Sequence, residues 1–266
     1  MPEFGSFVAV GDSFSEGVGD PRPEGGWRGW ADRYAARLAV QPGGLRYANL
    51  AIRGKVLGQV IADQLPEAIT MAPDLVSIAA GGNDLLRPRA DPDVLAERFD
   101  AAIAQLTAAG PAVLMFTGFD PGAFPLLRLI RGKVAAYNMH LRVIAARHGC
   151  YLADLWSMRV LADPREWADD RLHLSPDGHR RVALLACEVT GVPVDEDWRA
   201  PLPDPAAAGP PGHPAAWLAA RRLDARWARQ YAAPWLGRRL RGISSGDGAV
   251  AKHPQLLELS PGAAVD

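Results

Sequence analysis

Short apolar runs alternate with stretches of helical periodicity from residue 7 to residue 190. The runs are rich in β-branched and small apolar residues, and glycine or polar residues end them, which is typical of buried strands. They predict strands over residues 7–10, 45–50, 74–80, 112–117 and 150–155.

The intervening stretches predict helices, because their apolar residues recur every three or four positions. These helices are expected over residues 27–38, 55–70, 91–109, 129–148 and 175–190. Strands that alternate with helices imply right-handed crossovers and a five-stranded parallel sheet covered on both faces, which is a three-layer α/β/α sandwich. The turns after the first three strands then open on one edge, where such sheets bind ligands.

The pattern changes after Val192, so we divide the chain into a core (residues 1–192), a linker (193–214) and an extension (215–266). Seven prolines interrupt the linker, which favours an extended conformation. Residues 215–232 return to helical periodicity with Trp227 on an apolar stripe, and residues 217–241 carry seven arginines and one aspartate.

The basic segment 215–241 complements the acidic remainder of the chain, so we expect it to dock on the core or on a second copy. A membrane surface or a partner protein is the alternative. The rest, from Gly242 onward, is expected to be partly mobile and without chemistry.

Composition sets broad limits on the protein class. A length of 266 residues with 48% hydrophobic content supports one substantial core plus an extension, and a net charge of −1 gives no argument for a nucleic-acid partner. Two cysteines, Cys150 and Cys187, are too few for a disulfide framework and indicate a reducing compartment, although one disulfide would fit. No leader precedes the first strand and no apolar run reaches the roughly 20 residues of a membrane span, so we expect a cytoplasmic protein without a transmembrane segment.

Candidate chemistry begins at Gly11-Asp12-Ser13, where the first strand ends. Alone, this tripeptide is also ordinary turn chemistry. Near the end of the core, however, His173 follows Asp170 by three residues in a loop, an offset that lets the carboxylate reach one imidazole nitrogen while the other faces Ser13. Acyl transfer through serine needs such a nucleophile, base and orienting acid, together with donors for the oxyanion.

Four blocks carry a family resemblance. They are Gly11-Asp12-Ser13 with Gly17, then Gly54 after Asn49-Leu50-Ala51, then Gly81-Gly82-Asn83-Asp84, and finally Asp170-Arg171-Leu172-His173. In order, spacing and strand context the chain resembles the GDSL esterase and lipase superfamily, also called the SGNH hydrolases. The first block ends in Phe14 rather than leucine, which affects no catalytic position.

The resemblance implies the flavodoxin-like SGNH hydrolase fold and a cofactor-independent enzyme. It implies Ser13 as nucleophile, His173 as general base and then acid, and Asp170 as the partner of His173. The backbone N–H groups of Ser13 and Gly54 and the side-chain amide of Asn83 would hold the oxyanion. These residue types suit the chemistry, because glycine lets the backbone approach the substrate and a carboxamide is a neutral donor.

Other polar residues have simpler interpretations. Asp12 and Asp84 are expected to support turns or cap helices. His179 lies six residues after His173 without a recognised ligand pattern, so we expect no metal site. Asp169 would replace Asp170 only if the loop register shifted. The remaining histidines are interpreted as structural or solvent-facing: His140, His148, His213 and His253.

The leading hypothesis is a serine esterase that hydrolyses acyl or acetyl esters of small molecules, lipids or sugars. An acyltransferase would form the same acyl-enzyme with a sugar or alcohol acceptor, and an inactive carbohydrate-binding or scaffold protein could share the fold. Four loops are expected to line the pocket and mix aromatic with charged residues, namely residues 16–26, 85–91, 119–125 and 156–168.

Overall fold

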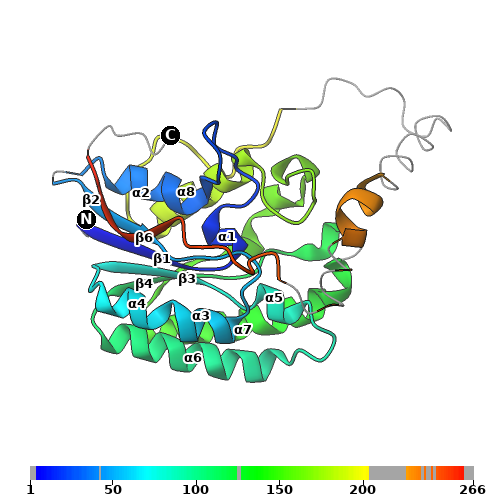
Figure 1. The fold of residues 1–266 in the computed structure, drawn as a ribbon, viewed down its shortest axis with the longest axis horizontal. Coiled ribbons are helices and arrows are strands. Elements are labelled where there is room, and N and C mark those ends of the chain that lie inside the picture. The colour runs from blue at the N-terminus through cyan, green and yellow to red at the C-terminus, as the bar shows by residue number, and fades with distance from the viewer. Residues whose placement is uncertain are drawn as a thin grey trace.

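The computed structural model describes residues 4–41, 43–124, 127–203, 226–234, 237, 241 and 244–260. It contains a six-stranded sheet in the order β5-β4-β3-β1-β2-β6 (Figure 1). Five strands are parallel: β1 (Ser6–Gly11), β2 (Leu45–Asn49), β3 (Leu75–Ala79), β4 (Ala112–Phe116) and β5 (Tyr151–Ala153). The sixth, β6 (His253–Leu259), pairs antiparallel with β2 at one edge.

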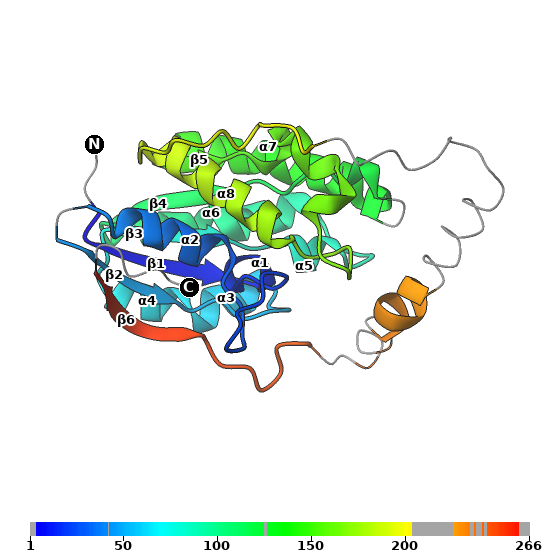
Figure 2. The ribbon, with the colours of Figure 1, turned by 90° about the horizontal axis from the view of Figure 1, so that it is seen from above.

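Helices cover both faces of the sheet, as Figures 1 and 2 show. One layer consists of α2 (Gly29–Leu38) and α8 (Pro176–Thr190), and the other of α3 (Leu57–Asp63), α4 (Leu65–Thr70), α6 (Pro92–Ala108) and α7 (Arg131–His148). Two single-turn helices, α1 (Ser13–Glu16) and α5 (Gly82–Leu85), follow β1 and β3. The remaining short elements are η1 (Pro121–Ala123), η2 (Leu127–Ile130), η3 (Leu155–Ser157), η4 (Arg159–Ala162), η5 (Pro164–Glu166) and the π-helical turn η6 (Ala228–Ala232).

The central strand β1 separates two hydrophobic cores. Its side chains alternate between the faces, so Phe7 and Ala9 pack with α2 and α8, whereas Val8 and Val10 pack with the other layer. Every residue of β1 is buried. A strand covered on both sides is a rigid support for the turn that follows it, where the Gly-Asp-Ser block lies.

The predicted three-layer α/β/α sandwich is confirmed, but the prediction of a five-stranded, wholly parallel sheet is wrong in strand number. β6 comes from the extension, within the part expected to be partly mobile, for which no strand was predicted. Partly buried and exposed side chains do not alternate at every second position along β6, and Pro254 lies inside it. Its sequence therefore lacks the regular pattern of a strand. Pairing with β2, far away along the chain, is what forms it.

The predicted helix over residues 55–70 is two helices, α3 and α4, which meet at Gln64. The other predicted helices are present, with small shifts at their ends. Residues 204–225, which include much of the predicted linker and the start of the basic helix, lie outside the described residues.

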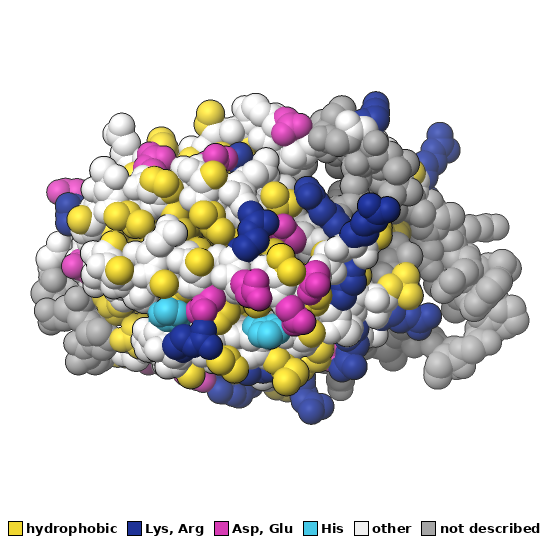
Figure 3. Space-filling view, turned by 90° about the horizontal axis from the view of Figure 1, so that it is seen from below, with side chains coloured by type: hydrophobic (Ala, Val, Ile, Leu, Met, Phe, Trp, Pro, Cys, Tyr) yellow, Lys and Arg dark blue, Asp and Glu magenta, His cyan; other side chains and the backbone are white. Residues whose placement is uncertain are grey.

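Charged side chains interleave with apolar ones on the face formed by α6 and α7 (Figure 3). Ion pairs link the two helices there, for example His140 with Asp93 and Arg147 with Asp100. Both cysteines are free thiols. Within the described ranges, no helix is long and apolar enough to cross a bilayer.

Candidate active site

Ser13 is the first residue of α1, directly after β1. Asp12 caps this helix, as predicted, by accepting a hydrogen bond from the Phe14 N–H at 3.1 Å. The Phe14 ring packs against Trp30 and Phe116, with ring centroids 5.5 and 5.3 Å apart. The turn that carries Ser13 is therefore held by a cap on one side and an aromatic anchor on the other.

Gln64 supports the same turn from the junction of α3 and α4. Its side-chain oxygen accepts from the Gly11 N–H at 2.7 Å, and its amide donates to the Gly11 carbonyl at 2.9 Å. The carboxamide thus pairs with the end of β1 as a neighbouring strand would. Sequence reasoning missed this residue, whose only local signal was a glutamine within the apolar stripe of the predicted helix.

Asp170 and His173 lie together in the loop before α8. The carboxylate Oδ2 is 2.6 Å from the imidazole Nδ1, and Oδ1 accepts from the N–H groups of Leu172 and His173. Burial opposes ionisation of Asp170, but these hydrogen bonds outweigh it and leave its pKa below the ordinary 3.8. An ionised carboxylate on Nδ1 orients the ring and leaves Nε2 available as a base.

The loop is closed by its own backbone. The Ser175 N–H donates to the Glu166 carbonyl, and the Ala168 N–H donates to the His173 carbonyl, both at 2.8 Å. Between them Arg171 adopts a left-handed φ of 54°, a conformation that favours glycine. This strained backbone conformation lies in the turn that brings the Asp170 carboxylate to the His173 ring.

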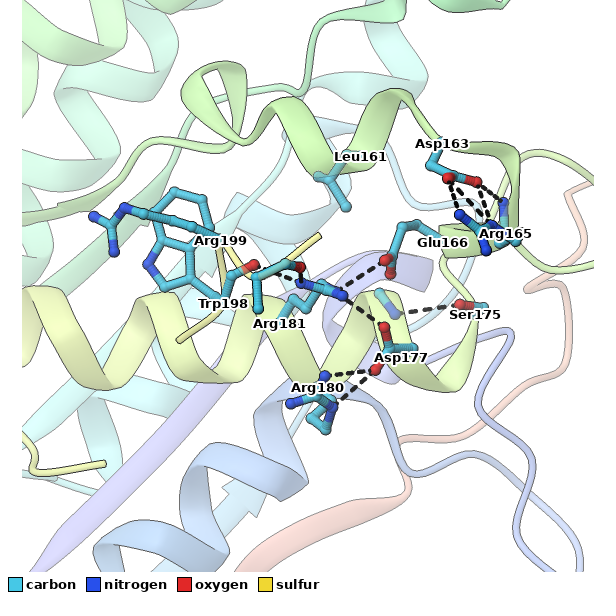
Figure 4. Close-up of polar contacts among 12 residues, drawn as sticks. Leu161, Asp163, Arg165, Glu166, Ser175, Asp177, Arg180, Arg181, Trp198 and Arg199 are labelled. Carbon is cyan, nitrogen blue, oxygen red and sulfur yellow. Dashed lines mark hydrogen bonds and ion pairs between the residues drawn. The ribbon is translucent and has the colours of Figure 1, made fainter. Parts of the chain in front are cut away.

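Arg181 of α8 fixes the loop from below (Figure 4). It is buried and forms ion pairs with Glu166 at 2.8 Å and Asp177 at 2.9 Å. The same guanidinium donates to the carbonyls of Trp198 and Ala200. One arginine therefore ties the loop to α8 and to the first part of the predicted linker.

The turn after β2 carries Gly54 with a φ of 75°, which glycine adopts readily. Glu16 of α1 holds this turn, because its carboxylate accepts from the Arg53 N–H at 2.6 Å and also binds the Arg53 guanidinium. The N–H groups of Ser13 and Gly54 donate to no atom in the described part of the chain. Sequence reasoning left the role of Glu16 unassigned.

Asn83 links the turn after β3 to the turns after β1 and β2. Its amide donates to the Lys55 carbonyl at 3.0 Å, next to Gly54, and to the Asp12 carboxylate at 3.1 Å. Burial raises the pKa of Asp12 to about 6, while the Phe14 N–H and the nearby His173 ring act against this rise. The loop after α1 also packs on the histidine loop, since a Cβ on Gly19 would lie 3.2 Å from that of His173.

The four blocks thus meet at the carboxyl end of the sheet. Ser13 and His173 share no hydrogen bond in the described structure. Asp84 braces the site, as predicted, by accepting from the Leu57 N–H at 2.9 Å. A cleft of about 1080 Å³ lies between two of the loops expected to line the pocket, 119–125 and 156–168, and is bordered by Arg128, Trp156 and Arg159.

The other histidines have separate surroundings. His148 pairs with Asp100, and the His253 ring packs on Tyr47. His179 is buried, accepts from the Trp30 N–H on Nδ1 and donates from Nε2 to the Val18 carbonyl. His213 lies outside the described residues, among which no group of three metal-ligating side chains occurs.

His179 should make the protein sensitive to acid. Burial lowers its pKa to about 4, whereas the unfolded residue titrates near 6.5. Unfolding therefore takes up a proton between these values, so the free energy of unfolding should fall by on the order of 3 kcal/mol as the pH drops from 6.5 to 4. Denaturant unfolding of the wild type and of His179→Gln across this range measures the effect, and an unchanged pH dependence in the variant would contradict it.

The class of protein follows from the fold together with the family that its sequence matches: this is an α/β enzyme that hydrolyses carboxylic esters. The sequence model of the GDSL-like Lipase/Acylhydrolase family matches residues 9–181, and the chain belongs to this family. The family predicted from the four blocks is thereby confirmed.

Solved structures share the fold at low sequence identity. The chain is similar to LAE5, an alpha/beta hydrolase enzyme from the metagenome of Lake Arreo, Spain, with 22% identity over 71% of this chain and 95% of that chain, at a TM-score of 0.60. It is similar to TesA, with 24% identity over 69% of this chain and 97% of that chain, at a TM-score of 0.59. It is also similar to Axe2, an acetylxylan esterase from Geobacillus stearothermophilus, with 22% identity over 73% of this chain and 95% of that chain, at a TM-score of 0.59. No curated protein sequence matches the chain.

Proposed function

We propose that the protein is a serine esterase that works through a covalent acyl-enzyme, with Ser13, His173 and Asp170 as its triad. The observation that carries this proposal is the 2.6 Å contact between Asp170 Oδ2 and His173 Nδ1, in a loop that packs on the segment following Ser13. This contact leaves one imidazole nitrogen for the serine.

In the first half-reaction, Ser13 Oγ attacks the ester carbonyl carbon while His173 Nε2 takes the hydroxyl proton. The tetrahedral oxyanion is held by the N–H groups of Ser13 and Gly54 and by the Asn83 amide, which exchanges one of its two acceptors, the Asp12 carboxylate or the Lys55 carbonyl, for the oxyanion. Its collapse breaks the bond to the alkoxy oxygen, which leaves with the proton from His173. Water then repeats the sequence, breaks the acyl–Ser13 bond and returns the proton to the serine.

The substrate we propose is an acyl or acetyl ester of a small molecule, lipid or sugar. Axe2, which has the same fold, is an acetylxylan esterase. The cleft between the 119–125 and 156–168 loops, whose lining includes neither the triad nor the oxyanion donors, combines Trp156 and Leu129 with the guanidinium groups of Arg128 and Arg159. These side chains suit a small acyl group next to a polar or anionic portion of the substrate.

Purified protein tests the proposal directly. We expect turnover of p-nitrophenyl acetate and butyrate, and labelling of Ser13 by a fluorophosphonate. An added alcohol acceptor separates hydrolysis from acyl transfer, because a transferase would form the new ester faster than free acid. Absence of both turnover and labelling would reject the proposal.

Removal of the Asn83 amide should weaken catalysis without weakening substrate binding. We expect Asn83→Ala to lower kcat by about 10²- to 10³-fold, as loss of an oxyanion donor does elsewhere, with KM nearly unchanged. Steady-state kinetics on p-nitrophenyl acetate measure this. Gln105→Ala, which removes an exposed carboxamide from α6, is the control, and equal rates in the two variants would argue against the role of Asn83.

A further inference from the structure

Residues 244–252, here named the C-terminal strap, follow the basic part of the extension and precede β6. Figure 1 shows this segment running from β6 past α1 at the carboxyl end of the sheet. Its first part is a compact turn, in which the Ser244 N–H donates to the Asp247 carboxylate and the Gly246 N–H donates to the Ser244 hydroxyl. The Ala249 N–H closes the turn on the Gly246 carbonyl.

This compact turn lies directly on the turn that carries Gly54. A Cβ on Gly54 would lie 2.2 Å from Ser244 Oγ, and a Cβ on Gly246 would lie 2.0 Å from the Arg53 carbonyl oxygen. Both distances are far below any real contact, so the two segments meet through glycines and leave no room for a side chain. Gly246 is buried.

The same turn is also held by Glu16, which binds the Arg53 backbone and side chain. The turn is therefore clamped between α1, which begins with Ser13, and the strap. Such a clamp fixes the direction of the Gly54 N–H relative to Ser13.

Lys252 anchors the other end of the strap. Its ammonium group is largely buried, donates to the carbonyls of Glu16 at 2.8 Å and Arg28 at 2.6 Å, and forms an ion pair with Asp32 at 2.8 Å. Asp32 is fully buried and also binds Arg22 and the Tyr47 hydroxyl. The Glu16 carboxylate thus holds the Gly54 turn, while the Glu16 backbone carbonyl is held by Lys252 of the strap.

We propose that the C-terminal strap is part of the active site and that Gly246 and Lys252 are positioning residues for the oxyanion donor Gly54. This proposal rests on the proposed esterase function. A segment more than 50 residues beyond the predicted core would then complete the catalytic centre, which gives the extension a catalytic purpose distinct from docking by its basic helix.

Gly246→Ala tests the proposal, because the added methyl group must push the strap and the Gly54 turn apart. We expect kcat for p-nitrophenyl acetate to fall about ten- to hundredfold with KM within twofold, since only transition-state stabilisation is affected. The inhibition constant of phenylboronic acid, which forms a tetrahedral serine adduct, should rise by a similar factor. Gly132→Ala on α7 adds the same methyl group where nothing lies within 4 Å, and should change neither quantity.

Lys252→Met provides a second variant that releases the anchor without adding bulk to the turn. It should lower kcat in the same way, whereas Lys133→Met, which removes a lysine bound to the carbonyls of Arg87 and Pro88, should not. Thermal unfolding identifies folded variants, and kcat is compared well below the midpoint.

Two outcomes separate the proposals. If the wild type hydrolyses esters while folded Gly246→Ala and Lys252→Met retain kcat within twofold, the strap only covers the sheet edge and this inference is overturned. If the wild type hydrolyses no ester and Ser13 is not labelled, the proposed function fails, and the strap has no oxyanion donor to position.

Discussion

Replacing Ser13 by alanine is expected to reduce kcat for ester hydrolysis by about 10⁴- to 10⁶-fold and to abolish fluorophosphonate labelling. The loss is large because no other group can form the acyl-enzyme once the hydroxyl is gone. Folding should be preserved, since the Ser13 side chain makes no hydrogen bond in the described structure and the cap of α1 comes from Asp12. Stopped assays with p-nitrophenyl butyrate and mass spectrometry of labelled protein measure the two effects.

Ser260→Ala is the matched control for this variant. Ser260 directly follows β6, is exposed, and does not line the cleft of about 1080 Å³. It should keep wild-type rates and full labelling. Residual labelling of Ser13→Ala at wild-type stoichiometry would place the nucleophile elsewhere.

Asp170→Asn should reduce kcat by about 10⁴-fold while leaving the loop in place. Asparagine can still accept from the N–H groups of Leu172 and His173 through its Oδ1. It cannot stabilise the imidazolium that forms when His173 takes the serine proton, and its amide favours the wrong tautomer of the ring. The expected result is a folded enzyme that binds substrate with a similar KM and turns it over slowly.

Asp169→Asn controls for the neighbouring carboxylate and also tests the alternative register. The structure assigns the contact with His173 to Asp170 alone. Asp169→Asn should therefore keep kcat within a few fold of wild type. A larger loss in Asp169→Asn than in Asp170→Asn would mean that the loop shifts its register in solution.

Local patterns account for what the sequence predicted well. Ser13 and Asn83 each follow a strand whose apolar run ends in glycine, and Gly54 lies in the turn after the second strand, so their common edge could be inferred from the parallel order. Asp170 and His173 are only three residues apart in a loop, so their contact could be predicted without knowledge of the tertiary structure. All of these positions depend on short-range periodicity and turn chemistry.

Gln64 and β6 show where local patterns fail. Gln64 occupies a helical position, yet it interrupts the helix and pairs with Gly11, which lies 53 residues earlier. β6 has an irregular exposed pattern, and it becomes a strand because the free edge of β2 needs a partner. Neither result could follow from propensity, because both depend on a partner that only the folded chain brings near.

The layered α/β architecture, the family and the residues proposed to act on the ester could be predicted from the sequence, because strand and helix periodicities and the four blocks are encoded over short spans. How those residues are held depends on the folded chain, through Glu16 on Arg53, Gly246 on the Gly54 turn, and Lys252 on Asp32. Some of these contacts join segments that are more than 200 residues apart in the sequence. Their distances are set by the packing of whole layers, which no local pattern records.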